Sequence, residues 1–259
     1  MIQKLLFFVA FFYAATSFAQ PASYTTANAH SHNDYTQSAP FFSAYYAQFG
    51  SIEVDIFFEK DAILVAHTDQ DLSQSHTLEE MYLKPLQTFI QTNHGSVYAD
   101  TSRKLQLYLD VKTDAPSTLT KLLEILQKYP TLTNCNSLKF VISGRKPDPE
   151  TYTYYPKYIW FDGLLSEKYS KTAMSRIVML TDNFLNYTKW KGDGPAPAND
   201  WAAIKKVVDR AHALGKTVRF WNTPDFMDVW ELLTKLGVDY INSDSIKSLA
   251  AFLKTRTQS

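Results

Sequence analysis

The segment TVRFWNTPDFMDVWELLTKLGVDYIN, residues 217–242, contains a complete strand–helix–strand unit. The apolar run 217–221 predicts a strand, residues 226–236 predict a helix, and residues 239–242 predict a second strand. Gly237 directly follows the helix, where glycine ends helices because it adopts a left-handed backbone conformation. Strands that are joined by a helix in this way favour neighbouring positions in a parallel sheet.

The same alternation extends toward the N-terminus. Apolar runs predict further strands at 51–56, 62–66, 105–111, 138–142, 158–161 and 176–180, and a short one that leads into His30. Leucines or aliphatic residues on one face predict helices at 118–128, 201–214 and 246–255. Thr77 with Glu80 three residues later forms a capping box and predicts the start of another helix. Eight or nine such units predict a single (β/α)₈ TIM barrel.

This count of strands exceeds eight by one. Either 62–66 pairs as a hairpin with 51–58, or 176–180 lies outside the barrel. An open, doubly wound sheet is the alternative fold. The Gly- and Pro-rich stretch 189–200 indicates a loop on the barrel and not a linker, so we expect residues 20–259 to form one domain.

Residues 1–19 have the pattern of a secretory signal peptide. Lys4 precedes an apolar run from Leu5 to Ala15, and small residues lead to a cleavage site after Ala19. That run is too short to span a bilayer core of about 30 Å. We therefore expect an exported protein, periplasmic or extracellular, with no integral membrane segment after signal cleavage.

The composition argues against several function classes. Lys+Arg and Asp+Glu number 26 each, so no positive surplus exists to neutralise the phosphates of a nucleic acid. Only 8 glycines are present and no GxGxxG occurs, which disfavours a glycine-rich phosphate loop. The single cysteine, Cys135, excludes an intramolecular disulfide and a zinc site built from cysteines.

Carboxylates interrupt two of the predicted strands. Glu53 and Asp55 stand two residues apart in SIEVDIF and point to the same face of one strand, and Asp110 stands in LYLDVKT. Such carboxylates, about 7 Å apart, repel each other unless a cation lies between them. Each one alone is more simply a surface or salt-bridge residue, but the three together favour a metal site. Oxygen ligands select Ca²⁺ or Mg²⁺.

Histidines follow two predicted strands, at the end of the barrel where the carboxylates are also expected. His32 in HSHNDY and His67 after ILVA are the predicted acid/base pair, although each alone is equally typical of a core or surface histidine. Zinc held by two histidines and a carboxylate is less favoured, because the helical His spacings of zinc enzymes are absent. We expect Glu53→Gln to abolish activity with little loss of stability, since it relieves repulsion among the carboxylates.

Four motifs occur in the order used by the phospholipase C-like phosphodiesterase superfamily: HSHNDY (30–35), IEVDIF (52–57), LVAHT (64–68) and LYLDVKT (107–113). TLEEMYLKPL and RFWNTPD extend the likeness, which resembles most the subgroup named after the yeast protein "altered inheritance of mitochondria 6". The resemblance covers about residues 28–253. It implies the barrel fold and a metal-dependent hydrolase of phosphodiesters of the glycerophosphodiester or lipid head-group type.

The resemblance also implies roles for single residues. His32 and Asn33 match the catalytic His and the metal-binding Asn of a Ser-His-Asn-x-Tyr context. An Ala-His-Arg-Gly alignment would instead select His30, which is the second choice. His67 matches the second catalytic His.

Further matches concern the metal and the phosphate. Glu53 and Asp55 match the Glu-x-Asp metal pair of the superfamily, and Asp110 stands where most relatives carry a Glu. Lys112 matches a phosphate-contacting lysine, and Trp221 matches an aromatic residue at the barrel mouth.

The expected reaction is metal-assisted cleavage of a small-molecule or lipid-derived phosphodiester. Arg145 in VISGRKP follows a strand end and is a further candidate phosphate ligand. The Arg of His-Arg-Gly and the Pro-Glu-Asn-Thr segment of glycerophosphodiesterases are missing, which weakens glycerophosphodiesters as the specific substrate. The alternatives are a non-catalytic ligand-binding barrel and a metal-dependent phosphomonoesterase.

Overall fold

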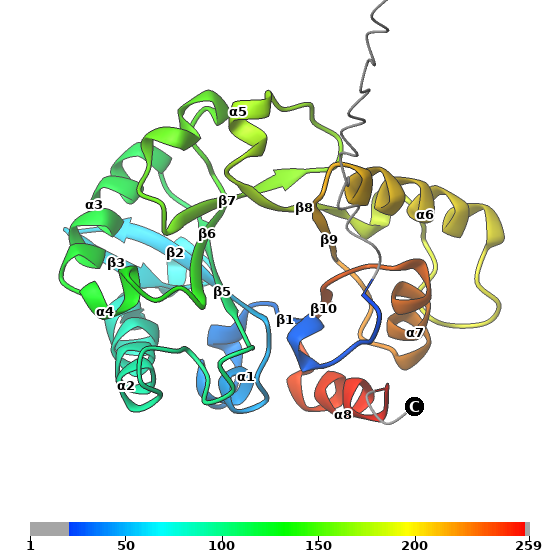
Figure 1. The fold of residues 1–259 in the computed structure, drawn as a ribbon, viewed down its shortest axis with the longest axis horizontal. Coiled ribbons are helices and arrows are strands. Elements are labelled where there is room, and N and C mark those ends of the chain that lie inside the picture. The colour runs from blue at the N-terminus through cyan, green and yellow to red at the C-terminus, as the bar shows by residue number, and fades with distance from the viewer. Residues whose placement is uncertain (1–20, 257–259) are drawn as a thin grey trace, which may run out of the picture.

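The structure is a computed structural model that describes residues 21–256, so the predicted signal segment 1–19 lies outside the described residues. Eight parallel strands form a ring, and the helices lie on its outer side (Figure 1). In spatial order the strands are β10 (Ile241–Ser243), β1 (Ala29–Ser31), β2 (Ser51–Glu59), β5 (Leu105–Val111), β6 (Leu138–Gly144), β7 (Ile159–Leu164), β8 (Ile177–Asn183) and β9 (Thr217–Trp221).

The barrel closes between β9 and β10. Arg219 and Tyr240 form a parallel bridge, and the backbone N–H of Asp239 donates to the carbonyl of Val218 at 3.1 Å. The strand β1 pairs in parallel with both β10 and β2. The predicted (β/α)₈ barrel is therefore confirmed, and the open, doubly wound sheet is excluded.

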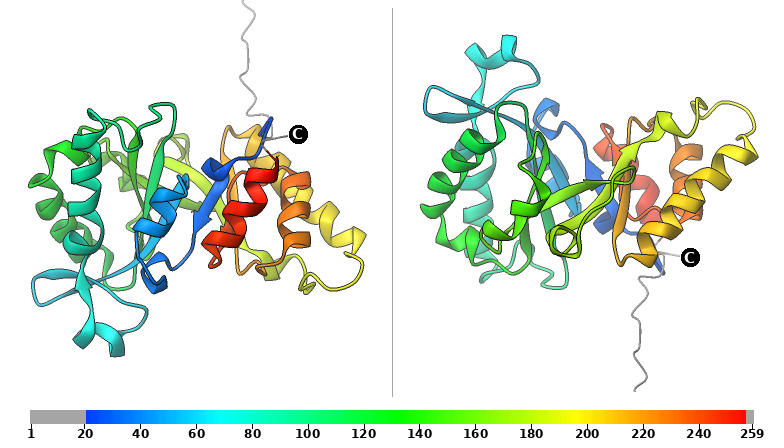
Figure 2. Two further views of the ribbon diagram at one scale, coloured as in Figure 1. Left: turned by 90° about the horizontal axis from the view of Figure 1, so that it is seen from below. Right: turned by 90° about the horizontal axis from the view of Figure 1, so that it is seen from above.

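The surplus strand of the prediction belongs to a hairpin. The strand β3 (Ala62–Val65) pairs antiparallel with the end of β2, and β4 (His76–Thr77) pairs with β3. Residues 177–183 lie within the barrel, so the first of the two alternatives for the extra strand is correct. The hairpin projects beyond the carboxyl ends of the barrel strands, where Figure 2 shows it in cyan.

The described residues form eight α-helices, of which the five longest correspond to predicted helices and the three shortest were not predicted. They are α1 (Phe42–Tyr46), α2 (Lys84–Thr92), α3 (Ala115–Gln127), α4 (Pro130–Thr133), α5 (Lys171–Met174), α6 (Ala198–Ala213), α7 (Met227–Leu236) and α8 (Ile246–Arg256). A π-helical turn, Glu79–Leu83, precedes α2, and the predicted Thr77–Glu80 capping box forms there. Gly237 ends α7 with φ of 85°, a conformation that glycine adopts without a steric penalty.

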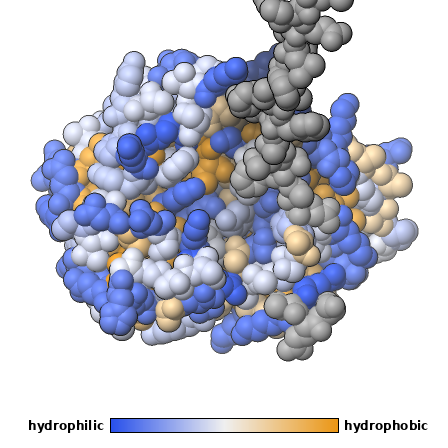
Figure 3. All heavy atoms as spheres, in the orientation of Figure 1, coloured by the Kyte–Doolittle hydropathy of each residue, from blue (hydrophilic) through white to orange (hydrophobic). Residues whose placement is uncertain are grey.

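Two apolar layers hold the barrel together. The larger core lies between the strands and the helices, and it includes Leu119, Leu122 and Leu126 of α3. The smaller cluster comprises Tyr108, Val141 and Met179. Because the helices turn their apolar faces inward, hydrophilic residues dominate the visible outer surface (Figure 3). None of the described helices is both long and apolar enough to cross a membrane.

Candidate active site

A pocket of about 400 Å³ opens at the carboxyl ends of the barrel strands, and we call it the mouth. Its lining comes from seven of the eight barrel strands or the loops that follow them. The lining residues are His32, Asn33, Glu53, Asp55, His67, Asp110, Lys112, Ser143, Gly144, Lys146, Asp162, Leu164, Thr181, Arg219, Trp221 and Asn222.

Three carboxylates converge in the mouth. Glu53 and Asp55 project from the same face of β2, and Asp110 of β5 is the direct neighbour of Asp55 in the parallel ladder. One oxygen of each residue lies within 4.8 Å of the others. The predicted convergence of Glu53, Asp55 and Asp110 is therefore confirmed.

Asp55 and Asp110 share one cation. The Lys112 Nζ lies 3.1 Å from Asp55 Oδ2 and 3.3 Å from Asp110 Oδ1. Burial raises the pKa of Asp55 to about 6, because Lys112 offsets only part of the burial effect and Asp110 and Glu53 add repulsion. Burial and the Glu53 charge also raise the pKa of Asp110. This pair therefore holds more negative charge than its surroundings neutralise.

Glu53 differs because it has strong partners. Its Oε2 accepts hydrogen bonds from the Arg219 guanidinium and lies 2.7 Å from His30 Nε2. Burial alone would raise the pKa of Glu53, but Arg219 and then His30 outweigh burial and hold this pKa well below its usual value. Sequence reasoning missed Arg219, although an arginine inside the apolar strand TVRFW was a signal of a buried ionic partner.

The two histidines of HSHNDY lie in different environments. His30 is fully buried, with Nδ1 2.7 Å from Ser51 Oγ and Nε2 at Glu53. Burial, followed by the charge of Arg219, lowers the pKa of His30 to about 3, so its ring is neutral. His30 thus contacts Glu53 inside the barrel and does not line the mouth. This position disagrees with the alternative prediction, in which His30 in place of His32 is the catalytic histidine.

His32 lies just beyond β1 and does line the mouth, with 25% of its side chain exposed. Its Nδ1 is 2.8 Å from Asp244 Oδ1, and its Nε2 is 3.8 Å from Glu53 Oε1. Burial would lower the pKa of His32, but the hydrogen bond to Asp244 and the charge of Glu53 raise it above its usual value. Asp244 was not among the predicted site residues, since 212 positions separate it from His32.

His67 is connected to the carboxylates through Tyr35. The Tyr35 hydroxyl lies 2.9 Å from His67 Nδ1, 2.9 Å from Asp55 Oδ2 and 3.1 Å from Asn33 Oδ1. His67 is open to solvent, with 63% of its side chain exposed. Asn33, the predicted metal-binding amide, adopts a left-handed backbone with φ of 45° at the same end of the barrel. Tyr35 therefore fixes the positions of three predicted site residues.

The remaining predicted residues separate into two groups. Lys112 and Trp221 line the mouth, whereas Arg145 is exposed and does not line it. The next residue, Lys146, takes the position that we expected for Arg145. Sequence reasoning also missed Asp162, a buried carboxyl group of the mouth that accepts a hydrogen bond from Thr181 at 2.8 Å. Burial raises the pKa of Asp162 to about 6.

Gly144 fixes the position of Asp110. Its φ is +66°, and a Cβ atom added there would lie 2.0 Å from Asp110 Oδ1 and 2.7 Å from the carbonyl oxygen of Val111. Only glycine combines that backbone conformation with such a close approach. The absence of a side chain at this position therefore leaves space for the Asp110 carboxylate.

Comparison with known proteins finds similarity to the same family that the sequence motifs resemble. Residues 21–141 match the family model of the AIM6-like phosphodiesterase domain. Altered inheritance of mitochondria protein 6 homolog of Arthroderma benhamiae is 26% identical, and the match covers 86% of this chain and 82% of the relative. Altered inheritance of mitochondria protein 6 of Eremothecium gossypii is 25% identical, with 86% and 68% covered.

A solved structure has the same fold. The crystal structure of a glycerophosphodiester phosphodiesterase from Parabacteroides distasonis superposes with a TM-score of 0.58, and the match covers 91% of this chain and 99% of that one. At 16% sequence identity this likeness concerns the fold alone. The motifs, the family match over residues 21–141 and the barrel agree: the chain is similar to AIM6-like phosphodiesterase domains, and its fold is similar to that of a solved glycerophosphodiester phosphodiesterase.

Proposed function

We propose that the protein is a divalent-cation-dependent phosphodiesterase that uses His32 and His67 for proton transfer. The observation that carries this proposal is the convergence of three carboxylates within 4.8 Å in a mouth that both histidines and Lys112 also line. The family match supports phosphodiester hydrolysis as the reaction. The proposed substrate is a small-molecule or lipid-derived phosphodiester, met outside the cytoplasm if the predicted leader 1–19 directs export.

Glu53, Asp55 and Asp110 fit a divalent cation. Their donor atoms are all oxygens, as Ca²⁺ and Mg²⁺ prefer. Asp55 Oδ1 is buried and has no hydrogen-bond partner in the described part of the chain. Asn33 lines the same mouth and offers an amide group as a further ligand. A cation bound there would offset negative charge that develops on a phosphate oxygen during cleavage.

The lysines of the mouth supply positive charge for the phosphate. Lys112 lies between Asp55 and Asp110, and the two carboxylates raise its pKa against the opposing effect of burial. Lys112 is therefore protonated and can contact a phosphate oxygen next to the carboxylates. Lys146 lines the same pocket and offers a second ammonium group.

The two histidines divide the proton transfers. Asp244 holds the Nδ1 of His32, which leaves the Nε2 of His32 directed toward the mouth. Tyr35 similarly holds the Nδ1 of His67. One ring removes the proton from the attacking hydroxyl as the new P–O bond forms, and the other gives a proton to the leaving oxygen as the old P–O bond breaks.

Chromogenic substrates test this proposal. Bis(p-nitrophenyl) phosphate and p-nitrophenyl phosphate would be assayed side by side with Mg²⁺, with Ca²⁺ or after chelation. We expect turnover of the diester with at least one cation and its loss on chelation. Turnover of the monoester alone would indicate a phosphomonoesterase, and turnover of neither would indicate a binding protein. Undiminished diester cleavage by the chelated protein would refute the metal requirement.

A further inference from the structure

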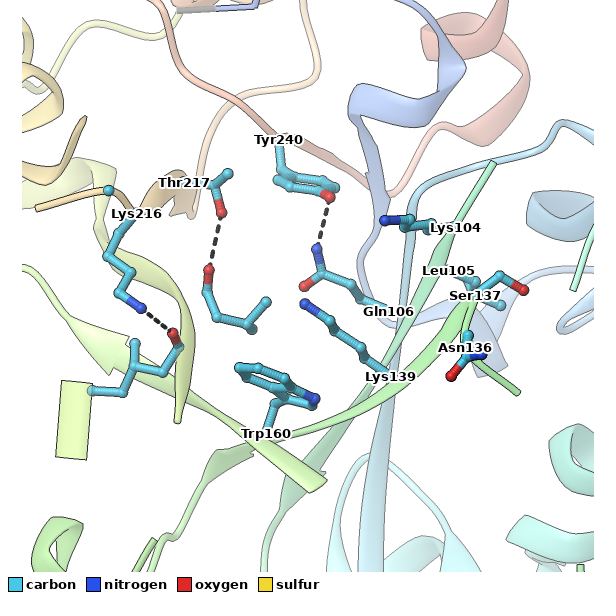
Figure 4. A pocket seen from close by; sticks show the side chains of 13 residues that line it. Lys104, Leu105, Gln106, Asn136, Ser137, Lys139, Trp160, Lys216, Thr217 and Tyr240 are labelled. Carbon is cyan, nitrogen blue, oxygen red and sulfur yellow. Dashed lines mark hydrogen bonds between the residues drawn. The ribbon is translucent and has the colours of Figure 1, made fainter. Parts of the chain in front are cut away.

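A second pocket, of about 320 Å³, lies at the amino-terminal end of the barrel strands, and we call it the floor pocket (Figure 4). Its polar and aromatic lining includes Lys104, Gln106, Lys139, Trp160, Lys216 and Tyr240. No residue lines both this pocket and the mouth. On β5, Gln106 lies at the floor, Asp110 at the mouth, and the buried ring of Tyr108 between them. The two pockets are therefore separate.

The floor pocket carries positive charge without a matching carboxylate. Lys104, Lys139 and Lys216 line it, and its described lining contains no Asp or Glu. Lys216 donates to two backbone carbonyls, whereas Lys104 and Lys139 have no ion pair or side-chain hydrogen bond within residues 21–256. Burial lowers the pKa of Lys139, and the charges of Lys104 and Lys216 lower it further. An anion in the pocket would reverse this repulsion.

The pocket also contains a hydrogen-bond acceptor that lacks a partner. Gln106 is only 8% exposed, and its Nε2 donates to the Tyr240 hydroxyl at 2.7 Å. Its Oε1 is buried and accepts no hydrogen bond from the residues that the structure describes. A buried acceptor without a donor is unfavourable, because it has lost its hydrogen bond to water. A ligand hydroxyl would satisfy it.

An aromatic face completes the site. The Trp160 ring lines the pocket, and the Lys139 Nζ lies 4.2 Å from its centroid. In Figure 4 the ammonium group of Lys139, the amide of Gln106 and the ring of Trp160 surround the same space. The pocket therefore presents a cation, a hydrogen-bond acceptor and a flat apolar surface together.

We propose that the floor pocket is a second, non-catalytic binding site for a small organic anion that carries a hydroxyl group. The anionic group would contact Lys139 and Lys104, the hydroxyl would donate to Gln106 Oε1, and the carbon skeleton would lie against Trp160. This inference does not depend on the phosphodiesterase proposal, because the two pockets share no residue.

Calorimetric titration of glycerol 3-phosphate into the metal-free protein tests this proposal. Without a cation the mouth holds the carboxyl groups of Glu53, Asp55, Asp110 and Asp162 and should bind anions weakly, so one site is expected. Lys139→Met keeps the apolar stem on Trp160, and Gln106→Met removes the acceptor, and each should weaken binding roughly tenfold or more. Lys128→Met, a change of an exposed lysine after α3, is the matched control and should bind like the wild type.

Further arms identify the ligand chemistry and the site. Glycerate in place of glycerol 3-phosphate distinguishes a carboxylate from a phosphate, and glycerol alone should not bind. Absence of binding of either anion to the wild type, or equal affinity of the wild type and Lys139→Met, would overturn the proposal. Loss of binding in Lys112→Met with retention in Lys139→Met would assign the anion to the mouth and also overturn it. Diester turnover by Lys139→Met should equal that of the wild type.

Discussion

The two ends of this barrel hold opposite charges. At the mouth, Glu53, Asp55 and Asp110 converge, while at the floor three lysines converge without a carboxylate among the described lining residues. Each end also buries an acceptor atom that has no hydrogen-bond partner in the part of the chain that the structure describes: Asp55 Oδ1 at the mouth and Gln106 Oε1 at the floor. Inward-pointing side chains of the parallel strands stack in layers along the barrel, so residues from several strands meet at each end.

The two ends differ in how their charge is neutralised. Glu53 has Arg219 and His30 as close partners, and Asp55 and Asp110 share Lys112. Among the described residues, Lys139 has only the face of the Trp160 indole ring as a partner. The mouth is therefore a built ionic network with a deficit of positive charge, and the floor is an open pocket with a deficit of negative charge.

The largest expected effect concerns chemistry at the mouth. His32→Ala and His67→Ala should each lower diester turnover by roughly 10²–10⁴-fold, the usual loss for a general acid or base. A p-nitrophenyl leaving group needs little protonation, so it should restore turnover in the variant that lacks the acid and not in the other. Steady-state rates with alkyl and p-nitrophenyl diesters measure this, with Lys139→Met as control. Equal losses on both substrates would show that the pair is misassigned.

The next largest expected effect is a difference in stability between variants of two carboxylates of the mouth. Glu53→Gln should destabilise the metal-free protein by about 3 kcal/mol or more, because it leaves the buried guanidinium of Arg219 without its carboxylate. This replaces our expectation from the sequence that Glu53→Gln would cost little stability. Asp55→Asn should leave stability unchanged or raise it, because Asp55 is incompletely neutralised and its pKa is raised to about 6. Urea denaturation of both variants measures the difference, and equal effects would contradict it.

The sequence predicted the fold because its information on strands and helices is local. Most barrel strands are apolar runs, although the three-residue strands β1 and β10 are not, and Gly237 and the Thr77–Glu80 pair mark helix ends within a few residues. The carboxylate cluster was also predictable, because the two-residue period of β2 places Glu53 and Asp55 on one face. Only the position of Asp110 beside Asp55 needed the order of the strands, which the predicted barrel supplied.

The partners of these residues were not predictable, because they depend on closure of the barrel. Arg219 meets Glu53 across 166 positions, and Asp244 meets His32 across 212. Both contacts exist only because β9 and β10 close the ring beside β1. The contrast between His30 and His32 depends on where β1 ends, since His30 lies within the strand and is buried, and His32 follows it and reaches the mouth.

The smallest expected effect concerns the floor. In the ligand-free protein, Lys139→Met should raise the free energy of unfolding by less than about 1 kcal/mol, because water in the open pocket screens the lysine charges.

Burial lowers the pKa of Lys139 from its ordinary 10.5. Because the pKa of Lys139 is lower in the folded protein than in the unfolded chain, the unfolded chain binds more protons between these two pKa values. The free energy of unfolding of the wild type therefore rises as the pH rises toward the pKa of the unfolded chain, and it falls as the pH falls. The advantage of Lys139→Met should therefore be largest near neutral pH and fade toward pH 10.5. Thermal unfolding across this pH range, with Lys128→Met as the exposed control, measures the trend. A clear loss of stability in Lys139→Met at neutral pH would show that this lysine holds the fold together, as Glu53 does at the mouth, and would contradict the description of the floor as an open pocket.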